Sequence, residues 1–310
     1  MGWKIVHLTK PCKIKVKNDN LILHFYEDEK DIKVTLRDVD FILFDTMQFS
    51  ITGKSIELLA KNNIATLFID ESFTPSSMLT PYFQHSTMTE IAHTQISITK
   101  EYKENVWRSI IKSKLLNQAK VLELFGNEKY KELEQIASKV QLYDKNNDEA
   151  QGARLYWQAI FNDPKFRREQ GAEDIHNSML NYGYAILRAS MARGVSASGM
   201  LPIFGIWHEN RYNAFNLVDD LVEPFRAFVD IQVKLLRKEY PHKTFLDGKL
   251  KRKIVSLLSF ECVDINGGVM ILNKAIEFYV RNYKKAMMRD EVSLIFYPSI
   301  NEKYFKYECL

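Results

Sequence analysis

Three segments of the sequence set carboxylates or an imidazole beside apolar residues, where charge is costly unless it is paired or binds a ligand. Glu149 precedes a run with small residues, His208 ends the run 205–208, and Asp220 and Glu223 stand three apart on one face of an apolar helix. Carboxylates with one imidazole suit Mg²⁺ or Mn²⁺. Such an ion keeps positions for water and phosphate oxygens. These residues predict a divalent-metal site for phosphodiester chemistry.

Each segment also has a purely structural interpretation. Glu149 could be an acid that interacts with a helix dipole, and His208 could be packed or capped. Asp220 and Glu223 could form a solvated acidic face with Arg226 as ion-pair partner. The spacings of 59 residues (208 − 149) and 15 residues (223 − 208) match no generic motif. From the residues alone, the ligand set is a hypothesis.

The first part of the chain has the pattern of β-strands. Alternation and short apolar runs predict strands at 3–8, 13–17, 21–26, 32–36, 41–44 and 64–69, with a short helix at 55–61. Residues 18–20 are a turn cluster that favours a hairpin. Pro75 and Pro81 indicate a linker. We therefore predict a β-rich domain at 1–82 and a linker at 83–95.

The remainder of the chain has helical periodicity. Trp107, Ile110, Ile111 and Lys114 begin a stripe with i, i+3, i+4 spacing, and Pro224 should kink or restart its helix just after the carboxylates. Further helices are predicted at 149–161, 173–193, 214–239, 249–260 and 269–289. The predicted fold class is α+β, with an all-α catalytic domain at 96–310.

Composition narrows the classes of protein. The three cysteines form no CxxC pair and the longest apolar run is too short for a membrane span, so a cytoplasmic protein without a membrane segment is predicted. The net charge of +4 divides unevenly. Residues 1–90 hold 10 basic and 12 acidic side chains, which leaves 33 and 27 for residues 91–310. If the protein binds a polyanion, the helical part is therefore where it would bind, although an excess of six charges is a weak signal.

At these residues the chain resembles a known family, the CRISPR-associated integrases that insert new spacers into CRISPR arrays. The resemblance covers about residues 3 to 285 and lies in the combination of motifs. It rests on the glutamate motif 149–157, the helix 177–187 with its Leu-Asn-Tyr-Gly-Tyr core, the histidine motif 205–208 and the acidic motif 216–226, with 50–52 and 63–71 resembling the end of the family's β-domain. The acidic motif looks most like that of integrases found with type II systems.

The resemblance implies an enzyme, a metal-dependent DNA endonuclease and integrase. Its catalytic metal ligands would be Glu149, His208 and Glu223, with Asp220 as a supporting ligand or a neighbour of the ligands, and the ion would be Mg²⁺ or Mn²⁺. It also implies an asymmetric homodimer, a small ferredoxin-like adaptation partner, and double-stranded DNA as spacer precursor and CRISPR repeat. The effector nuclease of type II systems is a further expected partner.

Basic residues of the helical part would then hold the DNA backbone. The candidates are Arg154, Arg167, Arg168, Arg188, Arg193, Lys249, Lys251, Arg252 and Lys253, although several could be solvated surface charges. Tyr156 and Trp157 are expected to pack in the core. Three alternatives remain: a non-catalytic DNA-binding scaffold of the same fold, a metal-dependent hydrolase of small phosphate compounds, and a structural helical interaction protein.

Overall fold

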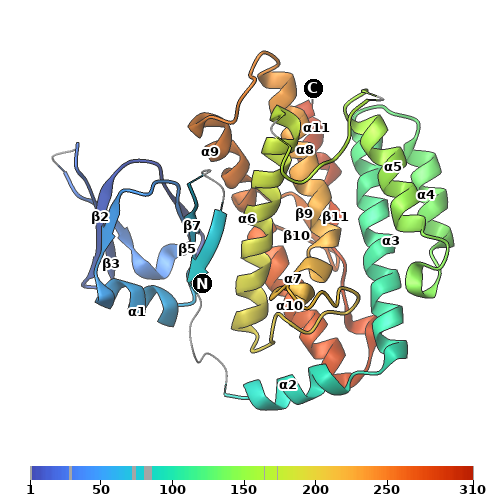
Figure 1. Cartoon of the computed structure of the whole chain (residues 1–310), viewed down its shortest axis with the longest axis horizontal. Helices are drawn as coiled ribbons and strands as arrows, with labels where there is room; N and C mark the ends of the chain where they lie inside the picture. The colour runs from blue at the N-terminus through green and yellow to red at the C-terminus, as the bar shows by residue number, and fades with distance from the viewer. Residues whose placement is uncertain are drawn as a thin grey trace. The chain divides into compact units, whose positions relative to one another are not determined.

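A computed structural model describes residues 2–27, 30–71, 75–79, 86–163, 165–172 and 174–309. The chain divides into two compact units, Met1–Ser86 and Thr87–Leu310, and each is described by itself (Figure 1).

The first unit contains two four-stranded sheets, with strand orders β1-β5-β7-β8 and β4-β3-β2-β6. In the first sheet β5 pairs parallel with β1 and β7, and β8 pairs antiparallel with β7. In the second, β3 pairs antiparallel with β2 and β4, and β6 pairs parallel with β2. The elements are β1 (Lys4–Leu8), β2 (Cys12–Lys17), β3 (Asn20–Phe25), β4 (Ile32–Thr35), β5 (Val39–Phe44), β6 (Phe49–Ile51), α1 (Gly53–Lys61), β7 (Ala65–Ile69) and β8 (Pro75–Leu79).

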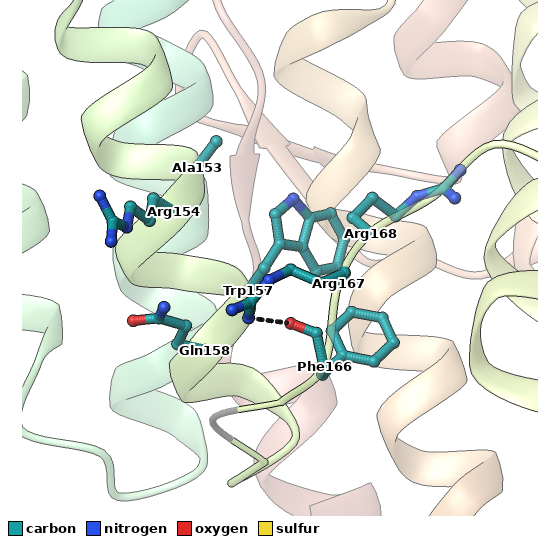
Figure 2. Close-up of a pocket in the computed structure, with 7 residues that line it drawn as sticks. All are labelled: Ala153, Arg154, Trp157, Gln158, Phe166, Arg167 and Arg168. Carbon is teal, nitrogen blue, oxygen red and sulfur yellow. Dashed lines mark hydrogen bonds between the residues drawn. The ribbon is translucent and has the colours of Figure 1, made fainter.

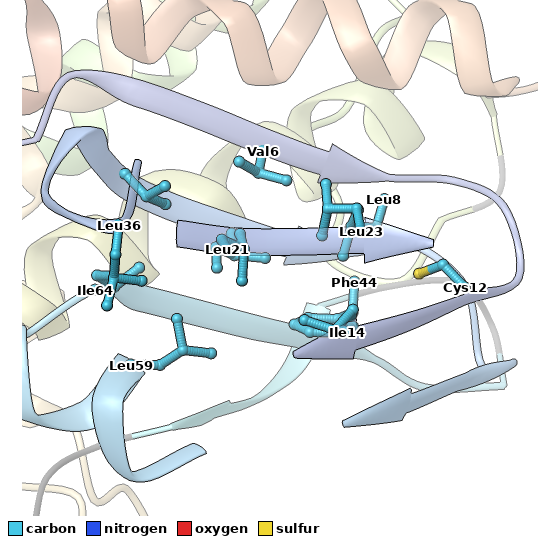
Figure 3. Packing of buried hydrophobic residues seen from close by; sticks show 12 residues of the cluster. Val6, Leu8, Cys12, Ile14, Leu21, Leu23, Leu36, Phe44, Leu59 and Ile64 are labelled. Atoms are coloured by element: carbon cyan, nitrogen blue, oxygen red, sulfur yellow. The ribbon is translucent and has the colours of Figure 1, made fainter. Parts of the chain in front are cut away.

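The predicted hairpin joins β2 to β3. Asn18 and Asp19 have positive φ values of 50° and 54°, and Lys17 pairs with Asn20, so the turn is a two-residue loop whose twist suits adjacent strands. Residues of both sheets and of α1 form one apolar core, and Figure 3 shows their side chains converging. The core includes Val6, Leu8, Cys12, Ile14, Leu21, Leu23, Leu36, Phe44, Leu59 and Ile64.

The predicted boundary region requires correction. Pro75 begins strand β8 instead of a linker, and proline is tolerated there because it is the first residue of an edge strand. Of the predicted linker 83–95, positions 83–85 lie outside the described residues, as does Pro81. Residues 88–95 are helical, since they belong to α2 (Met88–Ser97).

The second unit is mainly helical. Its longest helix, α3 (Lys100–Leu124), packs against elements from many parts of this unit. A 3₁₀ turn, η3 (Glu223–Phe225), separates α7 (Asn216–Leu221) from α8 (Arg226–Glu239), so the chain breaks at Pro224 as predicted. The other helices are α4 (Tyr130–Lys139), α5 (Asp148–Ile160), α6 (Ile175–Ala197), α9 (Gly248–Ser256), α10 (Leu272–Arg289) and α11 (Glu302–Cys309).

A small sheet modifies the prediction that this unit is all-α. Strands β9 (Val263–Ile265), β10 (Gly268–Met270) and β11 (Ser299–Ile300) pair antiparallel in the order β10-β9-β11. The α+β fold class is confirmed, with strands first and a helical part after them. Within the described ranges, no helix combines the length and apolar character that crossing a bilayer requires.

Candidate active site

The centre of the site is an ammonium group held between two carboxylates. Lys114 on α3 places its Nζ 2.6 Å from Glu149 Oε1 and 2.6 Å from Glu223 Oε2. Arg226 Nε donates to the other oxygen of Glu223, Oε1, at 2.8 Å. The side chains of Lys114 and Glu223 are only 11% and 7% exposed, whereas Glu149 is 30% exposed. The predicted pair Glu149 and Glu223 therefore meets from α5 and η3, opposite a lysine of a third element.

Two features of α5 place Glu149 at this position: the cap at the start of the helix and the packing of the helix on α3. Asp144 caps the helix, since its carboxylate accepts the backbone N–H of Asp148 at 2.7 Å and that of Glu149 at 3.1 Å. One turn later, Gly152 lies against Leu115 of α3, and a Cβ at this glycine would overlap the leucine side chain. The glycine lets α5 approach α3 closely, which brings Glu149 to Lys114.

Charge in this cluster controls the protonation of its members. Burial alone would raise the pKa of Glu223, but the charges of Arg226 and Lys114 outweigh it and lower that pKa to about 2. Burial likewise disfavours the charged form of Lys114, but the carboxylates of Glu223 and Glu149 raise its pKa above the ordinary value. Both carboxylate and ammonium are therefore charged at neutral pH.

His208 lies in the connection between α6 and α7, which Asp220 of α7 holds in place. Asp220 Oδ2 accepts the N–H groups of Ile206 at 2.6 Å and Trp207 at 3.0 Å, and Oδ1 accepts the N–H of His208 at 3.2 Å. The same Oδ1 lies 2.6 Å from His208 Nδ1. A Cβ at Gly205 would overlap the carbonyl oxygen of His208, so the turn requires glycine. Asp220 is fully buried and its oxygens are occupied, which suits a residue that orients His208.

The imidazole of His208 is held by a hydrogen bond at Nδ1, while part of its ring is exposed to solvent. Its side chain is 45% exposed, and the hydrogen bond to Asp220 raises the pKa of His208, against the effect of burial. Trp107 of α3 stacks on Trp207 with ring centroids 5.5 Å apart and meets the His208 ring edge-on at 5.8 Å. The aromatic pair and Asp220 together restrict the orientation of the imidazole.

Two carboxylates and one imidazole are suitable ligands for a divalent ion, but the three side chains do not converge on one point in this structure. Glu149 and Glu223 converge, and an imidazole that donates from Nδ1 leaves Nε2 as a possible metal-binding atom. Glu223 Oε2 is buried and has its ion pair with Lys114 but no hydrogen bond of good geometry. Within the described part of the chain, no three His, Cys, Asp or Glu side chains form a ready metal cluster. Lys114 occupies the space between the two carboxylates.

Sequence comparison assigns this chain to a family. Residues 5–247 match the family model of CRISPR associated protein Cas1. The chain belongs to the CRISPR associated protein Cas1 family. It is 32% identical over 262 residues to the CRISPR-associated endonuclease Cas1 of Neisseria meningitidis serogroup C (strain 8013), a match that covers 84% of each chain. The resemblance noted from the motifs is thereby confirmed.

Solved structures share the fold. A casposase bound to integration product superposes with a TM-score of 0.76 at 21% identity, covering 93% of this chain and 91% of that chain. A Cas6-RT-Cas1–Cas2 complex superposes with a TM-score of 0.73 at 16% identity, covering 97% of this chain and 36% of that one. Both similarities extend over nearly the whole Cas1-family chain.

Some of the basic residues predicted to contact DNA are instead part of the folded interior. Arg193 is 6% exposed and pairs with Glu277, and Lys251 is 7% exposed with its Nζ 5.1 Å from the ring centroid of Tyr182. The structure contradicts the DNA-binding prediction for these two, because buried cations cannot reach a phosphate backbone. Arg188 is half-buried and donates from Nε to Asp219 at 2.5 Å.

The other predicted cations are more accessible. Lys249 and Arg252 of α9 are exposed, and Lys253 binds Glu239 at 2.7 Å. Arg154 and Arg167 are exposed, whereas Arg168 is held against α6 by hydrogen bonds to Asn177 at 2.9 Å and Asn181 at 2.6 Å.

A cavity of about 500 Å³ joins three of these arginines to an aromatic side chain. Figure 2 shows Trp157 of α5 against the segment that carries Arg167 and Arg168, whereas the side chain of Arg154, also on α5, extends away from that segment. Trp157 is only partly buried and was expected in the core, whereas Tyr156 is fully buried as expected and donates to Asp230 at 2.8 Å. The lining residues are Ala153, Arg154, Trp157, Gln158, Phe166, Arg167 and Arg168.

Sequence reasoning missed Lys114 as a member of the site. The signal was present, because Lys114 occupies a position in the apolar stripe of α3 and a lysine there must find a counter-charge. Asp144 was also missed, and a carboxylate four residues before Asp148 gives only a weak capping signal.

Proposed function

We propose that the protein is a metal-dependent DNA endonuclease and integrase that inserts spacer DNA into a CRISPR array. In the reaction, a 3′-hydroxyl of the spacer would attack a phosphodiester of the repeat. The observation that carries the proposal is the meeting of Glu149 and Glu223 from separate elements, in a Cas1-family chain whose His208 is oriented by Asp220. The name of the Neisseria relative, an endonuclease, supports the same chemistry.

Glu149, His208 and Glu223 would hold Mg²⁺ or Mn²⁺. When bound, such an ion supplies a Lewis acid for a phosphate oxygen and lowers the pKa of the attacking hydroxyl or water. Asp220, fully buried and bonded to Nδ1, would keep the imidazole in the tautomer with Nε2 unprotonated. Arg226 would fix the plane of the Glu223 carboxylate by holding its Oε1.

The exposed basic residues of the second unit would bind the DNA backbone. Arg154 and Arg167 line one cavity with Trp157, so a phosphate and a base could be held by charge and by stacking together. Lys249, Arg252 and Lys253 on α9 form a second candidate group. The net charge of residues 91–310 favours a polyanion, which argues for DNA over a small phosphate compound.

The proposed partners are a second copy of this chain, a small ferredoxin-like adaptation protein, and the effector nuclease of type II systems. Support comes from the fold match to a Cas6-RT-Cas1–Cas2 complex and from the type II-like acidic motif. The cytoplasm is the proposed compartment.

The test is integration of a labelled spacer duplex into a repeat-bearing plasmid with Mn²⁺, with and without the small partner. Substituting a residue that only hydrogen-bonds to a metal ligand typically lowers activity by roughly 10- to 100-fold. E149Q and H208A each remove a proposed ligand itself, so each should lose more activity than that. E209Q is the matched control, because Glu209 is 76% exposed and pairs only loosely, at 3.6 Å, with Lys103. Wild-type integration by E149Q and H208A would instead favour the non-catalytic DNA-binding scaffold.

A further inference from the structure

The position of Lys114 is unusual for a lysine in a helical core. Its Nζ lies 2.6 Å from one oxygen of each carboxylate, so those two oxygens can be no farther apart than twice that distance. Two carboxylates this close repel each other unless a cation lies between them. A divalent ion that accepts oxygen ligands at about 2.0–2.6 Å demands a similar convergence. The ammonium therefore occupies the kind of place that an ion would take.

We propose that Lys114 is an internal cation that holds Glu149 and Glu223 together without a divalent ion and must yield its place when one binds. The inference rests on the proposed metal site. Each carboxylate would exchange one counter-charge for another, so the acidic pair stays neutralised in both states. Lys114 would thereby stabilise the metal-free fold and weaken the affinity for the ion.

Two features of the cluster favour displacement of Lys114 over a fixed role. Arg226 binds Glu223 Oε1, so the arginine can retain its contact while Oε2 exchanges partners. A lysine also has a flexible four-carbon stem and a point charge, unlike the rigid fork of an arginine. Its side chain is 11% exposed and that of its partner Glu149 is 30% exposed, so the ion pair is not fully enclosed.

The proposal predicts opposite effects of one substitution on stability and on metal affinity. K114M keeps the length and apolar stem but removes the charge, so without metal it should melt at a lower temperature than wild type. Its affinity for Mn²⁺, measured by calorimetry, should be tighter by about tenfold or more, since no cation competes and repulsion at short range is large. Saturating Mn²⁺ should raise its melting temperature more than that of wild type.

Controls separate this inference from the metal site itself. K114R keeps the charge and should bind Mn²⁺ no more tightly than wild type. K120M removes another lysine of α3, whose Nζ is 3.6 Å from Glu302, and should leave Mn²⁺ affinity unchanged. If K114M does not fold with or without Mn²⁺, K114Q measured in the same way decides.

The outcomes are distinct. Wild-type binding of Mn²⁺ that E149Q abolishes, combined with equal or weaker binding by K114M, would overturn the role of Lys114 while leaving the metal site standing. Wild-type protein that binds no Mn²⁺ would overturn the metal site and this inference together. Tighter binding by K114M with a lower melting temperature without metal supports the inference.

Discussion

At the level of single residues, the second unit contains a buried carboxyl that titrates outside the candidate site. Asp230 of α8 is fully buried and accepts hydrogen bonds from Tyr156 at 2.8 Å and from Tyr184. Burial raises its pKa to about 6, although the two tyrosines oppose the shift. The ring of Tyr184 is also approached by the guanidinium groups of Arg168 and Arg226, at 5.2 Å and 4.9 Å. Asp230 therefore contacts a tyrosine whose ring meets one arginine of the cavity and the arginine that holds Glu223.

This raised pKa makes stability depend on pH in a defined direction. The folded state binds the proton more tightly than the unfolded state, whose pKa is near the ordinary 3.8. The contribution of the protonated Asp230 to the stability of the fold is therefore complete below about pH 4 and is lost as pH rises through about 6. D230N cannot ionise, so relative to wild type it should gain about 1–3 kcal/mol between pH 4 and pH 8.

Urea unfolding of both proteins from pH 4 to pH 8 measures this difference. D264N serves as the control, because Asp264 is only half-buried in β9 and its substitution removes the same charge from a site with access to water. A difference between D230N and wild type that stays constant with pH would contradict the assignment.

The sequence identified some members of the site and could not identify others. Residue types make Glu149, His208 and Glu223 only a hypothetical ligand set, which the family resemblance then supports, and Pro224 predicts the break beside Glu223. The pairing of Lys114 with both carboxylates depends on three separate elements meeting, which no local pattern encodes. The burial of Arg193 and Lys251 was missed for the same reason, since exposure is a tertiary property.

At the level of elements, the packing of α5 on α3 sets the position of Glu149. Gly152 is three residues after Glu149 and shares its face of α5, and it contacts Leu115, the neighbour of Lys114. G152V should push the helices apart and destabilise the protein by about 1–3 kcal/mol, as overpacking does. It should also weaken Mn²⁺ binding, because Glu149 would move away from Glu223.

Thermal melting and Mn²⁺ calorimetry of G152V test this coupling. A153V adds two methyl groups on the same helix, at a residue that lines the cavity, and should affect Mn²⁺ binding much less. Equal effects of both substitutions would mean that the contact of Gly152 with α3 does not control Mn²⁺ binding.

Elements were predictable where the periodicity is local and long. Strands β1 to β5 and β7, helix α1, and helices α5 to α10 follow from alternation and from the helical stripe. Strands β9, β10 and β11 have three, three and two residues, too few for any period to appear. Strand β8 was hidden because Pro75 resembles a linker signal, yet proline is acceptable where the edge strand begins.

At the level of the whole molecule, the two parts of the chain differ in the sign of their net charge. Residues 1–90 have two more acidic than basic side chains, whereas residues 91–310 have six more basic ones. The exposed members of this excess include Arg154 and Arg167, which line the same cavity as Trp157. If they bind phosphates, each releases counterions when DNA binds, and affinity falls with salt accordingly.

The double variant R154Q/R167Q should therefore lower the slope of log affinity against log salt by about two, since each neutralised phosphate accounts for roughly 0.9 of that slope. Fluorescence anisotropy with one labelled duplex from low to high salt measures the slope. K13Q/K15Q changes the charge equally at exposed positions of β2, in the acidic part of the chain, and should leave the slope unchanged. Equal decreases in the two variants would show that net charge, rather than phosphate binding at the cavity, governs DNA affinity, because only direct binding distinguishes one pair of cations from another.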